Sequence, residues 1–408
     1  MSHILKSMIS KKTCFFKFSF FAVSILAFSC SHNVGKTPDI ILDRNIDITV
    51  DVKKTDSIPL SNIVSEVKFV QFDSSGETSF EKIDELDYDD SRYFVLDKDY
   101  AKKLIIFDAN GKLIKQTASG QKNSPITFCL DKANNHIIVA YKNQKINTYD
   151  YDLNLVGQDS LYLFYRSLAF SPIDSTLLFN FSKMINFKTK ELAIGERKEI
   201  SYELYVYNKN DNIKNLYFPF SLDQFPQGSL YPEIPRSFYN YKDTILYVKP
   251  LDNSIYAWNG GKHQFERRYS IRFQNSKILE NIDSISGKAF FDFLHSNLSD
   301  GYSFLIKDAI ETDKILFFNF FKEKELFTNV YLKNTGHSIS GKLINDIYHL
   351  PILISDKIQD QFISVVYPRQ IEEFYKNRSK ESLGDVFDKL LVLKNKKKPI
   401  LCLQKSKF

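Results

Sequence analysis

The sequence is poor in glycine, methionine, tryptophan and cysteine, with 14, 3, 1 and 4 residues respectively in a chain of 408. So few glycines exclude a collagen-like repeat, and so few cysteines exclude a small domain held together by disulfides. Multi-span membrane proteins are also excluded, because long apolar runs are missing. Aromatic residues are abundant, with 23 Tyr and 36 Phe, and 25% of the residues are charged. This composition indicates a folded protein rich in aromatic strands.

Neither sign of charge is in large excess. The chain has 55 Lys and Arg and 49 Asp and Glu, a net charge of +6. Four lysines lie in the first 29 residues, and no acidic residue precedes Asp39. Removing residues 1–29 would lower the net charge from +6 to +2. Nucleic-acid binding needs a basic face, so this balance argues against a nucleic-acid partner.

The N-terminal segment predicts an export signal over residues 1–29. Its lysines precede an apolar run of eleven residues, 18–28, which is too short to cross a hydrocarbon core of about 30 Å. The run ends at Ala27-Phe28-Ser29-Cys30, which resembles a bacterial lipobox, so we expect lipid on Cys30 and a linker over residues 30–45. An ordinary cleaved signal and a retained anchor are the alternatives.

The segment after Cys30 bears on which side of the membrane the protein faces. Some Gram-negative surface lipoproteins resemble one another in having an acidic export tag after the lipidated cysteine. Residues 31–36 lack such a tag. We therefore expect a lipid-anchored outer-membrane protein on the periplasmic side rather than on the cell surface.

Beyond residue 45, short apolar runs alternate with turn residues, which is typical of an all-β sandwich, barrel or propeller. The predicted strands are residues 64–72, 93–96, 103–107, 137–141, 177–181, 203–207, 244–248, 315–320 and 361–367. Helical patterns are sparse, and we expect two short helical insertions, at 286–295 and 379–393.

A repeated unit consists of an apolar strand ending in an aromatic residue, a polar turn and a further strand. Residues 103–113, with the turn Asp108-Ala109-Asn110-Gly111, are its clearest case. The gaps between successive aromatic anchors are 42, 58, 51 and 73 residues, close to a propeller blade of about 40–50 residues with insertions. We expect each aromatic to pack between neighbouring blades, because one blade cannot bury both faces alone. The anchors are Phe107, Tyr149, Tyr207, Trp258 and Tyr331.

The stretch from residue 46 to 156 is similar to the start of the six-bladed β-propeller lipoproteins of Gram-negative bacteria, relatives of NHL-repeat propellers. The strand 64–72, then Tyr93-Phe94-Val95-Leu96-Asp97, and then residues 104–112 carry the resemblance. Residues 118–125 look like a degraded form of the family's Gly-x-Gly-Pro segment. The resemblance implies a six-bladed propeller over residues 46–408 and is silent on chemistry.

Ring closure follows from the cost of unpaired strand edges. We predict that the N-terminal strand 64–72 joins the C-terminal strands 362–367 and 400–403 in one shared blade. With five internal units this makes six blades.

No catalytic, cofactor or metal residue can be assigned from motifs. The sequence contains no HExxH, GxSxG, P-loop or GxGxxG pattern, and the acidic run 84–90 lacks the spacing of a Ca²⁺ loop, so we interpret it as a solvated turn. Cys129 and Cys402 lie in apolar runs and are interpreted as buried thiols, with a disulfide as the alternative. Five histidines are isolated in sequence and are interpreted as ordinary residues, although a propeller can gather one residue per blade at its axis: His136, His263, His295, His337 and His349.

One segment suggests a ligand site. Residues 218–235 concentrate aromatics and prolines, which suit either a rigid packed loop or a binding surface for sugar or peptide. Arg236, Tyr239 and Tyr241 follow, where the next blade's inner strand would begin near the axis. They are our candidate ligand-binding residues.

The function these features favour is a lipid-anchored envelope propeller that acts, as a monomer, as a binding or scaffolding module for a peptide, glycan or protein partner. The alternative is an NHL-like lyase or hydrolase with an axial active site. A structural envelope protein without a discrete ligand is the third possibility.

Overall fold

A computed structural model describes residues 40–41, 45–73, 80–118, 123–161, 163–181, 200–208, 210, 213–221, 236–274, 303–376 and 398–408. These all belong to one compact unit, Val34–Phe408. The predicted signal 1–29, Cys30, most of the linker 30–45 and the helices expected at 286–295 and 379–393 lie outside them. In the described part of the chain, no helix has the length and apolarity that crossing a membrane requires.

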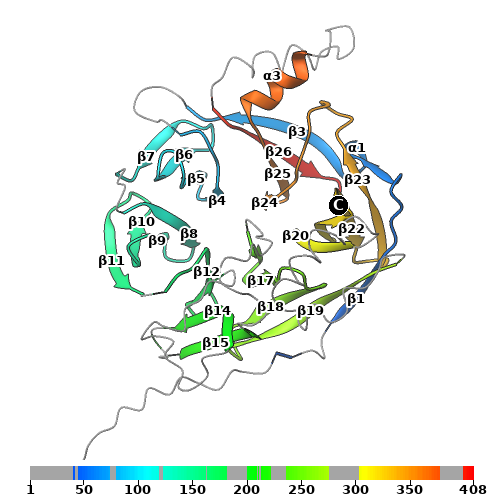
Figure 1. Ribbon diagram of the computed structural model, residues 1–408. Coiled ribbons are helices and arrows are strands. Elements are labelled where there is room, and N and C mark those ends of the chain that lie inside the picture. Colours follow the sequence, from blue (N-terminus) through cyan, green and yellow to red (C-terminus); the bar gives the residue numbers. More distant parts are fainter. Residues whose placement is uncertain are drawn as a thin grey trace, which may run out of the picture. The chain divides into compact units, whose positions relative to one another are not determined.

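The strands form six sheets arranged as blades around a common axis (Figure 1), so the fold is the predicted six-bladed propeller. The first three blades are antiparallel meanders whose strands follow the chain from the axis outward. Blade 1 contains β4 (Glu85–Asp89), β5 (Arg92–Asp97), β6 (Lys103–Asp108) and β7 (Leu113–Gln116). Blade 2 contains β8 (Pro125–Asp131), β9 (His136–Tyr141), β10 (Lys145–Asp150) and β11 (Leu155–Ser160). Blade 3 contains β12 (Ser167–Ser171), β13 (Thr176–Asn180), β14 (Ile200–Asn208) and β15 (Ile213–Ser221).

The other three blades include strands from the N-terminal part of the propeller. Blade 4 contains β16 (Phe238–Tyr241), β17 (Thr244–Val248), β18 (Ser254–Asn259), β19 (Gln264–Phe273) and β1 (Ile46–Val50). Blade 5 contains β20 (Ser303–Glu311), β21 (Ile315–Lys322), β22 (Glu325–Leu332), β23 (His337–Ile344) and β2 (Ser57–Pro59). Blade 6 contains β24 (Asp356–Ile358), β25 (Gln361–Val366), β26 (Ile400–Ser406) and β3 (Val64–Gln71). Two described helices flank these strands, α1 (Leu60–Ile63) and α3 (Pro368–Lys376).

The ring closes in blade 6, as predicted. β3 pairs antiparallel with β26, with Val70 opposite Leu401, and β26 pairs with β25. The shared blade therefore joins the N-terminal and C-terminal parts of the propeller and removes the strand edges that an open ring would leave.

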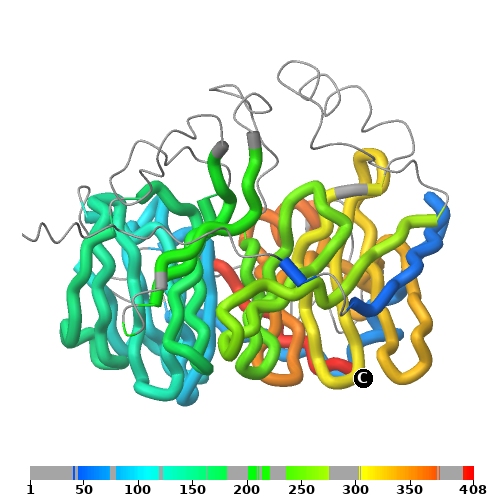
Figure 2. Tube along the Cα trace, turned by 90° about the horizontal axis from the view of Figure 1, so that it is seen from below, coloured from blue at the N-terminus to red at the C-terminus, as the bar shows by residue number. Residues whose placement is uncertain are grey.

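Two strands were not anticipated from the sequence. β1 and β2 each add a fifth strand to a blade, pairing in parallel with β19 and β23 (Figure 2). The β2–β23 contact is close, because a Cβ at Gly341 would lie 2.8 Å from the backbone of Ser57. The chain thus covers the outer edges of blades 4 and 5 before it enters the closing strand.

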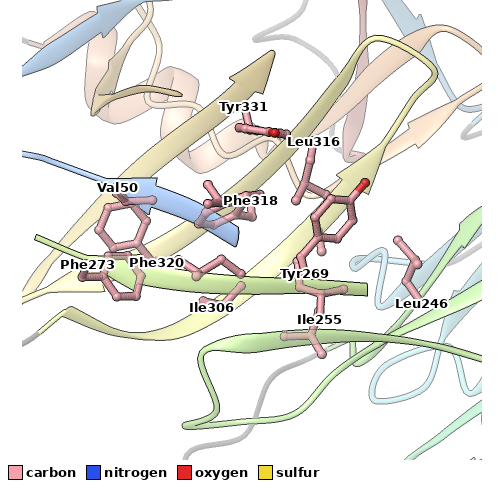
Figure 3. Close-up of a cluster of buried hydrophobic side chains, with 14 of the residues drawn as sticks. Val50, Leu246, Ile255, Tyr269, Phe273, Ile306, Leu316, Phe318, Phe320 and Tyr331 are labelled. Carbon is pink, nitrogen blue, oxygen red and sulfur yellow. The ribbon is translucent and has the colours of Figure 1, made fainter. Parts of the chain in front are cut away.

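The core lies between the blades. Six clusters of buried apolar side chains are found among the described residues, and each combines residues of two adjacent blades. Figure 3 shows the cluster between blades 4 and 5, which includes Tyr269 of β19 and Phe318 of β21. The second strands are accordingly apolar on both faces, as in the buried run of β5. All five predicted aromatic anchors lie in the third strand of their blade. Phe107, Trp258 and Tyr331 belong to such a cluster, and Tyr149 and Tyr207 are partly buried and pack against one.

The predicted turn chemistry is right in part. Gly111, in the β6–β7 hairpin, has φ of +84°, and a Cβ there would lie 2.2 Å from the carbonyl oxygen of Gln71 at the end of β3. In the equivalent hairpins of blades 2 and 4, Leu153 and His263 take the positive φ instead. Only the first hairpin therefore needs glycine both for its conformation and for its close approach to the closing strand.

Closure by β26 predicts a large effect of Leu401→Ala. Leu401 is fully buried between blades 6 and 1, so its truncation should lower the free energy of unfolding by about 2–5 kcal/mol. The control Glu66→Ala changes an exposed residue of the partner strand β3 and should cost less than about 0.5 kcal/mol. Urea titration measures both, and equal losses would contradict a closure stabilised by this packing.

Candidate functional site

The innermost strands of the six blades, β4, β8, β12, β16, β20 and β24, surround the axis. Described residues line three cavities along it, of about 450, 160 and 50 Å³. Arg236, two residues before β16, lines all three. A single cationic side chain thus links the hollow spaces at the centre of the ring.

The largest cavity, which we call the axial chamber, lies where the inner strands begin. Its wall is apolar on the side of blade 6, where Ile363 and Val365 of β25 line it, and α3 contributes Gln370. Its charged side chains are Asp84, Glu85, Arg236, Lys307, Asp308 and Asp356. An apolar wall with a few converging charges is the usual makeup of a ligand site.

Arg236 is held in place by three contacts. Its guanidinium pairs with the carboxylate of Asp356 on β24, and its Nε donates a 2.9 Å hydrogen bond to the carbonyl oxygen of Phe238. The hydroxyl of Tyr239 donates to the carbonyl oxygen of Arg236 at 2.7 Å. The side chain is still 30% exposed, so it retains surface that a ligand can reach.

Glu85, the first residue of β4, is enclosed beside Arg236. Its Oε2 accepts hydrogen bonds from the Thr127 hydroxyl at 3.0 Å and from the Phe128 amide at 3.1 Å. Burial raises the pKa of Glu85 to about 7, because these bonds and the charge of Arg236 offset only part of the desolvation. A carboxyl that titrates near neutral pH can hold or release a proton at the axis.

Asp308 belongs to an irregular inner strand. The β20–β21 register shifts on both sides of Lys307, and Leu305 and Asp308 have φ of +54° and +53°. The backbone amide of Asp308 donates to the Tyr239 hydroxyl at 2.9 Å, and burial raises the pKa of its carboxyl. Non-glycine residues in this conformation cost free energy and concentrate at functional sites, so these bulges mark the chamber.

The structure separates the three candidate residues. Arg236 lines the chamber, and Tyr239 is buried behind it, where its hydroxyl bridges Arg236 and Asp308. Tyr241, at the end of β16, lies outside the chamber, and its hydroxyl donates to Asp313 at 2.8 Å. The prolines and aromatics of residues 222–235, on which the sequence argument relied, lie outside the described residues.

The acidic run 84–90 differs from its sequence interpretation. It is mostly the inner strand β4 and not a solvated turn, and Glu85 and Asp87 line the axial cavities. The period-two alternation of Glu85, Asp87 and Asp89 with Leu86 and Tyr88 was the available signal. Asp308 and Asp356 carried no such signal, because only the fold brings their strands to the axis.

Histidine and cysteine contribute little to the axis. His263 lies at the boundary of blades 3 and 4, where its Nδ1 is 3.1 Å from Asp174, and no described histidine lines an axial cavity. Cys129 and Cys402 are free and buried, as one of the two interpretations held, and burial raises the pKa of each thiol. Among the described residues, no group of three or more His, Cys, Asp or Glu could hold a metal ion.

Comparison with known proteins adds a family and a fold. A family model described as a domain of unknown function, DUF4934, matches residues 43–405. A crystal structure from Bacteroides fragilis, described as that of a "Putative exported protein", is similar with a TM-score of 0.69 and 17% identity, covering 89% of this chain and 100% of that one. At this identity the likeness concerns the fold alone.

Two further solved structures are WD40 repeats of RRP9 and the protein U3-55K. Each covers 74% of this chain and 76% or 77% of its own, at 8% identity and a TM-score of 0.39, which is too low to carry an argument. No curated protein matches this sequence.

The raised pKa of Glu85 predicts a pH-dependent stability. Between its ordinary pKa of 4.5 and about 7, the folded protein binds more protons than the unfolded chain, so the free energy of unfolding falls as pH rises. Glu85→Gln should remove this fall, and its stability relative to wild type should rise by up to about 3 kcal/mol from pH 5 to 8. Urea titrations across this range measure it. Glu81→Gln, at an exposed position, should follow wild type, and a Glu85→Gln curve parallel to wild type would contradict the assignment.

Proposed function

The chain belongs to the DUF4934 family, and for this member we propose a lipid-anchored cell-envelope propeller that binds a peptide, glycan or protein segment in its axial chamber. The observation that carries the proposal is Arg236, which lines every axial cavity described above and is fixed by three contacts while its side chain stays partly exposed. A preorganised cation loses little side-chain freedom when a ligand binds.

A short peptide segment fits the chamber's chemistry best. The volume of about 450 Å³ is within the usual range for ligand pockets. Ile363, Val365 and Leu353 offer an apolar wall for a side chain, while Arg236 can donate to a carbonyl or carboxylate. Asp308 and Glu85, on other inner strands, can accept from amide or amine groups when ionised. Residues from the inner strands of several blades would thus contact the same ligand.

The proposed cellular location is the periplasmic face of the outer membrane. A basic segment and an apolar run of eleven residues precede Cys30, and the similar protein from Bacteroides fragilis is described as exported. Lipid on Cys30 would hold the protein at the membrane, and residues 30–45 would serve as the linker. We expect the propeller, over residues 46–408, to act as a monomer with the membrane as its partner through that lipid.

A second candidate function, a lyase or hydrolase of the NHL-like type, is favoured by one observation. Glu85, with a pKa of about 7, lies in the same chamber wall as the Arg236–Asp356 pair, and such a carboxyl suits general acid–base chemistry. A bound ligand recovered shortened or altered with wild type, and intact with Glu85→Gln, would support this function. A ligand recovered intact in both cases would support binding alone.

Arg236→Ala tests the binding proposal. Loss of a charged hydrogen-bond donor should weaken binding at least about tenfold, from the cost of about 1.5–3 kcal/mol per such bond. Arrays of peptides and of glycans supply candidate ligands, and titration of the purified protein with the strongest one measures the affinity. Arg272→Ala, on an exposed face of β19, is the matched control and should bind like wild type. Equal affinity in both variants would contradict a chamber centred on Arg236.

Cys30→Ala tests the anchor. The wild-type protein should incorporate a labelled fatty acid and sediment with membranes, whereas the variant should lose the label and most of its sedimentation. Labelling of both proteins, or of neither, would refute lipidation at Cys30. The result is independent of ligand binding, so the two parts of the proposal fail separately.

A further inference from the structure

The end of the axis opposite the chamber, which we call the channel mouth, lies where the inner strands end. It is a cavity of about 160 Å³. Three lysines from three blades face it: Lys132 directly after β8, Lys242 directly after β16, and Lys357 in β24. Arg236 reaches the same cavity from the chamber side. Four cationic groups thus converge on a space large enough for a small ionic group.

Three of these four cations have carboxylate partners. Lys132 pairs with Asp87 at 3.0 Å, and Lys242 pairs with Asp313 at 2.8 Å. Arg236 pairs with Asp356, as described above. Their charges are therefore largely compensated within the protein.

Lys357 differs from the other three. Its ammonium has no hydrogen bond or ion pair to any residue that the structure describes, and it lies instead over the ring of Tyr241, 5.7 Å from the ring centroid. The side chain is partly buried, and its ammonium is not among the fully buried polar atoms of the described residues. An ammonium that remains accessible and has no acceptor in the protein can donate to an external anion.

The surroundings of Tyr241 add to the positive field. Lys242, Arg268 and Lys333 lie 5.4, 5.3 and 4.6 Å from its ring centroid, besides Lys357. Arg268 and Lys333 share one carboxylate, the fully buried Glu311. The cavity itself is lined by four cations, Lys132, Arg236, Lys242 and Lys357, and by two carboxylates, Asp87 and Asp356.

We propose that the channel mouth is a binding subsite for a carboxylate or phosphate group, with Lys357 as its principal contact. The ammonium of Lys357 donates to the anion, and Lys132 and Lys242 contribute charge from the other blades around the cavity. Burial lowers the pKa of Lys357, with Lys333 and Lys132 acting in the same direction and Glu311 and Asp313 against it. Bound anion would oppose that shift. Lys357 does not line the chamber, so its role at the mouth does not depend on the function proposed above.

Titration with inorganic phosphate and with succinate tests the subsite, and the two ligands distinguish phosphate from carboxylate. We expect saturable binding by calorimetry for at least one of them, weakened at least fivefold in Lys357→Met and retained in Lys357→Arg. Lys324→Met, at the exposed β21–β22 hairpin, is the matched control and should bind like wild type. Equal binding in wild type, Lys357→Met and Lys324→Met, or no saturable binding of either anion, would overturn the proposal.

A second measurement keeps the test decisive if Lys357→Met does not fold. Acetylation of the wild-type lysines, followed by mass spectrometry, reports their accessibility one by one. The anion that binds should slow modification of Lys357 at least threefold and leave Lys324 unchanged. Equal slowing of both residues would indicate a general salt effect and overturn the proposal. Ligand retention in the chamber is measured separately, so failure of one site does not imply failure of the other.

Discussion

The pairing of β3 with β26 is the constraint on which the rest of the molecule depends. Each blade buries its two faces against neighbours, and the six clusters of the core all lie between blades. A ring with a gap would expose two of these faces and two rows of unpaired backbone groups. The ladder that places Val70 opposite Leu401, with their neighbours in register, removes that gap. The axis, its cavities and the convergence of residues from six blades exist only because the ring is closed.

Much of this fold could be predicted from the sequence, because the signal for it is local. The second strands of the blades are continuous apolar runs, and the third strands end in an aromatic residue followed by a turn. Both kinds of strand can therefore be recognised in the sequence. β1 and β2 could not be recognised, because short strands that pair in parallel with residues more than 200 positions away carry no local periodicity of their own. The resemblance to six-bladed propellers indicated the number of blades but could not indicate these additions.

The candidate site was predicted less well, and the reason is again physical. Arg236 could be placed near the axis because it lies just ahead of an inner strand. Glu85 was hidden in an acidic run, since a sequence does not show whether a charged strand faces water or a closed channel. Asp308 lies beside a register shift in β20, and no glycine or proline in that strand marks the irregularity in the sequence. The pairing of Arg236 with Asp356 joins residues 120 positions apart, which only the closed ring brings together.

The path of the chain ahead of the closing strand has a mechanical consequence. Ile41 bridges to Glu266, β1 then lies along β19, and β2 lies along β23 before the chain reaches β3. A force applied from the N-terminal side must break the β1–β19 ladder and then the β2–β23 ladder before any load reaches the strand that closes the ring. These two added strands therefore protect the closing ladder, and the β3–β26 pairing is the last to bear a load applied from the N-terminal side.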